Sequence, residues 1–149
     1  MGDNEMKKII LLLLCYIGVS CTNNRDIYQI IYTQCLQQKE QNFIFDFSES
    51  MNFDWDTMCV YSGKCSLDMI EKDLGGAYSN FKDIGIHIIF LKNKCIVYSQ
   101  AWYSVHYKNT KWIYFDSLNY KLKFHRSDTK FFVSKNDDVF TLHHIKNQY

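Results

Sequence analysis

The chain has 149 residues, which suits a single domain with a sizeable core. Apolar residues make up 47% of it and aromatic residues 17%, a composition that excludes an intrinsically disordered protein. The formal net charge is only +1, so the chain lacks the basic surplus of nucleic-acid-binding proteins, and we expect no nucleic-acid partner.

The N-terminus has the order of a secretory signal peptide. Two lysines precede an apolar run from Ile9 to Ile17, and small residues from Gly18 to Ser20 follow it. The run is shorter than the roughly 20 apolar residues that a transmembrane helix needs. We therefore expect residues 1–20 to be a signal peptide that is removed during export. Met6, which stands directly before the lysines, is an alternative start of the chain.

Cys21 directly follows these small residues. The arrangement resembles the lipobox of bacterial lipoproteins, in which the cysteine receives a lipid and becomes the mature N-terminus; Gly18 departs from the Leu, Val or Ile usual at that position. The resemblance implies a lipoprotein that is anchored to a cell-envelope membrane through Cys21, with acyl chains such as palmitate. A soluble periplasmic or secreted protein is the alternative, because Gly18 and Ser20 also satisfy the small-x-small rule for ordinary signal cleavage.

The sequence of residues 21–149 predicts a single α+β domain. A helix is expected over residues 25–41, with Asn23 and Asn24 as candidate caps, and a short helix that Ser66 caps and Gly75 ends. Alternating apolar residues between turn signals predict strands at 55–61, 86–91, 95–100, 111–116, 120–124, 130–134 and 139–144, and at 43–47 either a strand or an aromatic plug. We expect both helices to pack on one side of a mainly antiparallel sheet of five to seven strands, whose later strands form a meander.

The stretch from Ile84 to Tyr98 is expected to organise the domain. Both faces of its first apolar run are largely apolar, which predicts a central strand covered on both sides. Asn93 tolerates the left-handed backbone of a tight hairpin, so it predicts the turn. His87, inside the first run, is predicted to be a buried, hydrogen-bonded histidine.

Three segments carry a further resemblance. Phe53, Trp55 and Asp56 form an aromatic-x-Trp-Asp segment, Leu74 and Gly75 end the short helix, and Ile89 to Lys94 has the pattern hydrophobic-Phe-x-Lys-x-Lys. With these motifs the chain resembles a loose group of small, uncharacterised bacterial lipoproteins and secreted proteins. The resemblance covers about half the chain, implies a small α+β envelope protein and supplies no catalytic residue.

The cysteines offer several possible disulfide pairings. After processing at Cys21, four cysteines remain in an oxidising compartment, where two bridges in three connectivities could form: Cys35, Cys59, Cys65 and Cys95. Cys59 with Cys65 is the best candidate disulfide, because Gly63 between them can bend the chain back. The alternative is that both are free, small apolar side chains.

Asp54 and Asp56 flank Trp55, and this is the one paired-carboxylate arrangement with an aromatic neighbour. Glycosidases use two carboxyl groups about 5 to 9.5 Å apart beside a sugar-stacking surface. The same pattern is common in proteins that are not enzymes, so we assign no catalytic residue and take Asp54, Trp55 and Asp56 as a candidate binding surface. The rival prediction is a hydrolase that uses the two aspartates or a cysteine, such as Cys95 with His87.

The histidines lack the spacing of a metal site. His143 and His144 are adjacent, and on a strand they would point to opposite faces, so we expect no metal and no cofactor. The excess of aromatic residues, which are enriched at interface hot spots, and the lack of a convergent polar constellation predict a non-enzymatic module that binds another envelope protein. An inhibitor or immunity protein for an exported toxin is a further alternative.

Overall fold

The structure is a computed structural model that describes residues 26–83, 85–102, 112–136 and 139–146. The predicted signal peptide, the alternative start at Met6, the lipidation site Cys21 and the predicted caps Asn23 and Asn24 lie outside these residues. Within the described ranges, no helix has the length and apolar character to cross a membrane.

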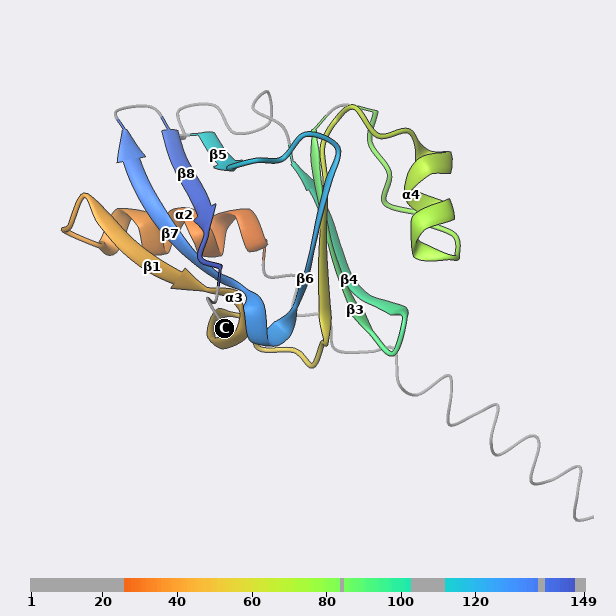
Figure 1. The fold of residues 1–149 in the computed structure, drawn as a ribbon, viewed down its shortest axis with the longest axis horizontal. Coiled ribbons are helices and arrows are strands. Elements are labelled where there is room, and N and C mark those ends of the chain that lie inside the picture. Colours follow the sequence, from red (N-terminus) through yellow and green to blue (C-terminus); the bar gives the residue numbers. More distant parts are fainter. Residues whose placement is uncertain (1–25, 84, 103–111, 137–138, 147–149) are drawn as a thin grey trace, which may run out of the picture.

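The described residues form three α-helices, one 3-10 turn and eight strands, so the α+β class is confirmed (Figure 1). In chain order the elements are α2 (Ile27–Gln37), β1 (Asn42–Asp46), α3 (Phe47–Ser50), β2 (Thr57–Tyr61), α4 (Leu67–Leu74), β3 (Ile86–Lys92), β4 (Cys95–Trp102), β5 (Trp112–Phe115), β6 (Lys121–His125), η2 (Arg126–Asp128), β7 (Lys130–Asn136) and β8 (Val139–His144).

The strands divide into two sheets of four rather than forming one. Sheet A has the order β1-β7-β8-β5, and sheet B has the order β4-β3-β2-β6. Every pairing is antiparallel except that of β5 with β8. The predicted meander is therefore wrong: after β5 the chain crosses from sheet A to pair β6 with β2, and it then returns to sheet A as β7.

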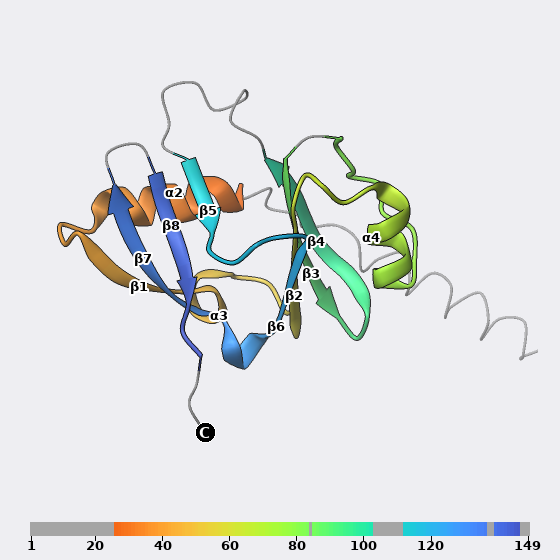
Figure 2. The ribbon, with the colours of Figure 1, turned by 45° about the horizontal axis from the view of Figure 1, so that its top comes forward.

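Two apolar clusters explain this arrangement. The larger cluster lies between the sheets, where the inner faces of sheets A and B meet α2 and α3, and it includes Phe47, Phe90 and Phe131. The smaller cluster lies on the other face of sheet B, beneath α4, and includes Cys59 and Ile89. Figures 1 and 2 show α4 on the side of sheet B that faces away from sheet A. The helices thus do not share one side of a sheet, because β3 is apolar on both faces and needs cover on each.

The predicted helix cap, helix end and hairpin turn, which depend on residues close in the sequence, are present in the structure. The Ser66 hydroxyl accepts a hydrogen bond from the Met69 amide at the start of α4, and Gly75 ends that helix with a left-handed φ of 72°. The β3–β4 turn has positive φ at Asn93 and Lys94, as a two-residue hairpin requires. The first helix differs from its prediction, because Asp26 caps it and it ends at Gln37.

His87 on β3 is fully buried, as the sequence predicts. Its Nε2 lies 3.0 Å from the Lys82 carbonyl oxygen, which only accepts, so Nε2 carries the proton and donates. Its Nδ1, 3.1 Å from the Tyr78 hydroxyl, then accepts. The ring also stacks on Phe81, with centroids 5.1 Å apart. Burial lowers the pKa of His87 below its ordinary value, so the neutral ring is the form that fits this site.

This burial predicts a pH-dependent stability. Because the folded-state pKa of His87 is lowered, the unfolded chain takes up the proton first, and the free energy of unfolding falls as the pH drops below about 6.5, the ordinary histidine pKa. One proton contributes at most about 1.4 kcal/mol per pH unit. Urea unfolding of the wild type and His87→Gln between pH 7.5 and 5 checks this prediction. The wild type should lose stability more steeply than the variant, and equal slopes would contradict it.

Candidate functional site

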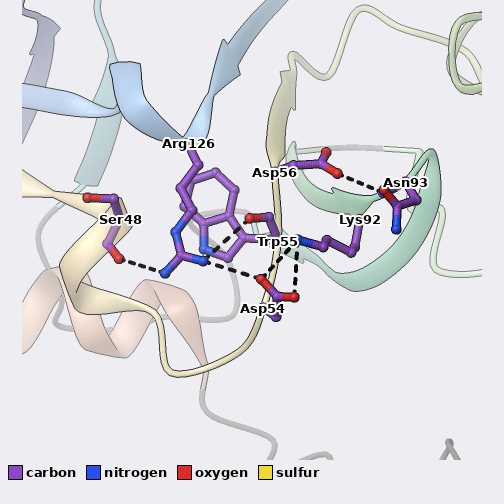
Figure 3. Close-up of polar contacts among 7 residues, drawn as sticks. All are labelled: Ser48, Asp54, Trp55, Asp56, Lys92, Asn93 and Arg126. Atoms are coloured by element: carbon purple, nitrogen blue, oxygen red, sulfur yellow. Dashed lines mark hydrogen bonds and ion pairs between the residues drawn. The ribbon is translucent and has the colours of Figure 1, made fainter.

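The predicted Asp54–Trp55–Asp56 surface lies in the loop before β2, where Trp55 is buried. The indole is only 1% exposed and meets the edge of Phe90, with ring centroids 4.9 Å apart. The guanidinium carbon of Arg126 lies 5.4 Å from the Trp55 ring centroid, so Arg126 covers the indole (Figure 3). Trp55 therefore belongs to the core. Its predicted role on a binding surface is wrong.

The two aspartates contact different neighbouring residues. Asp54 pairs with Lys92 at 3.1 Å and with Arg126 at 3.4 Å, and it is largely exposed (Figure 3). Asp56 accepts a 2.7 Å hydrogen bond from the Asn93 amide in the β3–β4 turn. That hydrogen bond is the main cause that lowers the pKa of the Asp56 carboxyl. Both carboxylates thus attach the loop to its surroundings.

These groups line an open depression of about 510 Å³, and its lining residues include the two aspartates, Lys92 and Arg126. Its charges balance, because two carboxylates face two cations that already pair with Asp54. Arg126 is held further by the Ser48 carbonyl oxygen at 3.2 Å. The buried indole offers no stacking surface for a sugar, so the depression lacks the aromatic platform that the glycosidase geometry needs.

The cysteines do not form the predicted bridge. Cys59 and Cys65 are both free thiols, packed in the smaller apolar cluster. The Cys65 thiol instead donates to the Tyr120 carbonyl oxygen at 3.2 Å, and burial raises the pKa of Cys59. The Cys95–His87 pair is wrong as well, because Cys95 lies opposite Lys92 in the hairpin, far along the strand from His87.

The outer face of sheet A, the face directed away from sheet B, exposes large apolar side chains. In the part of the chain that the structure describes, four of the nine exposed large apolar residues lie there: Ile44 on β1 (63% exposed), Phe132 on β7 (40%), and Trp112 (46%) and Tyr114 (42%) on β5. Ile44 and Phe132 are cross-strand partners, and the rings of Trp112 and Tyr114 stack with centroids 5.8 Å apart. We call these four residues the aromatic face.

A polar row separates the two halves of the aromatic face. Ser134 Oγ lies 3.1 Å from His143 Nε2, and His143 Nδ1 lies 3.0 Å from an Asp116 carboxylate oxygen. The hydrogen bond with His143 lowers the pKa of Asp116. His144, the next residue, pairs with Asp128 and packs on Phe124, so the two histidines do point to opposite faces of β8. Among the described residues, no cluster of three or more His, Cys, Asp or Glu side chains is placed to hold a metal ion.

The sequence contained a pattern that could have predicted part of this face, although it was used only to assign the strand. Trp112 and Tyr114 alternate with the buried Ile113 and Phe115, so one strand presents aromatic side chains on both faces. Adjacent exposed aromatic residues on the face opposite the core, such as the stacked Trp112 and Tyr114, are typical of a binding surface. The other half of the aromatic face, on β1 and β7, depends on the order of strands in the sheet, which the sequence did not reveal.

Comparisons with known protein families, with curated proteins and with solved structures give no match for this chain.

Proposed function

We propose that this chain is an exported protein, lipid-anchored at Cys21, that binds another protein of the cell envelope through the aromatic face of sheet A. The observation that carries the binding role is the concentration of Ile44, Phe132, Trp112 and Tyr114 on one sheet face. Antiparallel sheets commonly leave one face in water, but that face is then polar along each strand. Exposed aromatic residues there are instead typical of interface hot spots.

The polar row favours a protein as the partner over a ligand that makes only apolar contacts. Hot-spot side chains at protein interfaces are surrounded by polar groups that form hydrogen bonds with the partner. Ser134, His143 and Asp116 supply such groups between the two apolar halves. The same face therefore offers both apolar anchors and directional contacts.

Photocrosslinking in the native host tests the binding role. A photoreactive phenylalanine analogue at Tyr114 lies on the aromatic face, and the same analogue at Tyr120 is a matched control, because Tyr120 is exposed but lies between β5 and β6. We expect a single discrete adduct from position 114 and none from position 120. Adducts of equal yield from both positions would mean that the aromatic face has no preferred partner.

Lipidation at Cys21 is tested by location and mass. The wild-type protein should be recovered in the membrane fraction with the mass of a chain that begins at Cys21 plus a lipid, while Cys21→Ser should move to the soluble fraction or retain its signal peptide. Intact-mass spectrometry of both fractions is the measurement. An unmodified wild-type chain in the soluble fraction would support ordinary signal cleavage instead.

A further inference from the structure

The polar row of sheet A has the connectivity of a nucleophilic serine relay. Ser134 on β7, His143 on β8 and Asp116 directly after β5 come from three adjacent chain segments on the same face. The distances are 3.1 Å from Ser134 Oγ to His143 Nε2 and 3.0 Å from His143 Nδ1 to Asp116. Such relays are recognised by their geometry and roles rather than by the order of their residues in the chain.

The hydrogen bonds fix the direction of the relay. The Asp116 carboxylate accepts only, so His143 Nδ1 carries the proton and donates to it. In the neutral imidazole Nε2 is then the acceptor, and the Ser134 hydroxyl donates to it. This is the arrangement in which a histidine can take the proton of a serine hydroxyl, while the carboxylate orients the ring and stabilises the imidazolium.

Neighbouring strands place candidate oxyanion donors beside Ser134. The register sets Asn42 of β1 and Thr141 of β8 directly opposite Ser134 on its two sides. Directly opposite residues have Cβ atoms about 4.5 to 5.5 Å apart, which lets an amide or hydroxyl reach a group bound at Ser134. Side-chain amides and hydroxyls serve as oxyanion donors in acyl transfer.

Apolar side chains lie on both sides of the relay. The Phe132 ring lies 6.1 Å from the His143 ring, and Ile44 is the cross-strand partner of Phe132. Tyr114 is the β5 partner of Thr141 on the other side. An acyl group of apolar character fits this environment better than a charged one, because no lysine or arginine takes part in the hydrogen bonds of the relay.

We propose that Ser134, His143 and Asp116 hydrolyse carboxylic esters with an apolar acyl group, an activity that goes beyond the binding function. Ser134 Oγ attacks the acyl carbon while its proton passes to His143 Nε2. The bond from the acyl carbon to the alcohol oxygen breaks, and that oxygen takes the proton from His143. Water then attacks the acyl-Ser134 ester and gives its proton to His143. The acid leaves as the proton returns to Ser134 Oγ.

Hydrolysis of p-nitrophenyl butyrate by the full-length protein tests this proposal, together with intact mass after treatment with a fluorophosphonate probe. We expect one probe adduct on Ser134, and a rate at least about 100-fold lower for Ser134→Ala, because this variant lacks the attacking hydroxyl. Ser127→Ala is the matched control, since this exposed hydroxyl lies in η2, away from the relay. Ser134→Ala changes a strand residue on the solvent side, and its melting temperature verifies folding.

Two further readouts separate the relay from a merely structural network. Asp116→Asn should lower kcat with KM unchanged, because Asp116 positions His143 and does not contact the substrate. Ester hydrolysis is measured on the purified protein without a partner and photocrosslinking in the native host, so loss of hydrolysis and loss of partner binding are separate readouts. The proposal is overturned if folded wild-type protein takes up no probe, or if Ser134→Ala hydrolyses the ester as fast as the wild type.

Discussion

Replacement of Trp55 by alanine should lower the free energy of unfolding by about 3 to 5 kcal/mol, the usual loss for a large aromatic residue removed from a core. The indole is almost completely buried and lies between Phe90 and the Arg126 guanidinium. Its loss leaves a cavity at the point where η2 meets the hairpin of sheet B. Denaturant unfolding, followed by circular dichroism, measures the change.

Trp112→Ala is the matched control for this substitution. Trp112 is the same residue type, but it is 46% exposed on the outer face of β5. Surface substitutions usually change stability by less than about 0.5 kcal/mol, and the partial burial of Trp112 adds to that value. We therefore expect a loss well below that of Trp55→Ala. Equal losses at the two positions would contradict the assignment of Trp55 to the core.

The double substitution Ile44→Ser and Phe132→Ser should abolish partner binding without unfolding the protein. Each hot-spot side chain at an interface contributes at least about 2 kcal/mol on truncation, which corresponds to roughly 30-fold in affinity. The two residues are cross-strand partners, so they form a single apolar contact with any protein that covers this face. Titration of the partner identified by crosslinking measures the affinity.

Two controls accompany this double variant. It should still unfold cooperatively, with only a modest fall in melting temperature, because both side chains are partly exposed. Leu36→Ser removes an exposed apolar side chain from α2 instead, on the opposite side of sheet A. That variant should bind the partner normally. Undiminished affinity in the double variant would exclude this half of the aromatic face from the interface.

Local chemistry made part of the fold predictable from the sequence. A cap by Ser66, a left-handed stop at Gly75 and a turn at Asn93 each depend on residues close in the chain, and all three were confirmed. His87 was also predicted correctly as a buried, hydrogen-bonded histidine, because it stands within a run that is apolar on both faces.

Long-range pairing accounts for what the sequence did not predict. The return of β6 to β2 and the parallel pairing of β5 with β8 depend on which strands meet, and alternation within a strand carries no such information. Trp55 was assigned to an exposed site because two aspartates flank it. Their carboxylates bind Lys92, Arg126 and the turn at Asn93, and the ring between them is free to enter the core.

The candidate relay shows the same limit. Ser134, His143 and Asp116 have no recognisable spacing, since each is brought to the face by a different segment of sheet A. The sequence was therefore taken to lack a convergent polar constellation. The structure assembles one in the middle of the aromatic face, through hydrogen bonds of 3.0 and 3.1 Å.

The yield of photocrosslinked adduct from position 114, compared between the otherwise unaltered chain and the Ile44→Ser, Phe132→Ser variant, tests the aromatic face as a binding surface most directly. Both proteins carry the same photoreactive side chain on β5 and differ only on β1 and β7, which β8 separates from β5. We predict a discrete adduct in the first protein and its loss in the second, at equal amounts of folded protein in the membrane fraction. An adduct of unchanged yield and identity in the variant would contradict the account.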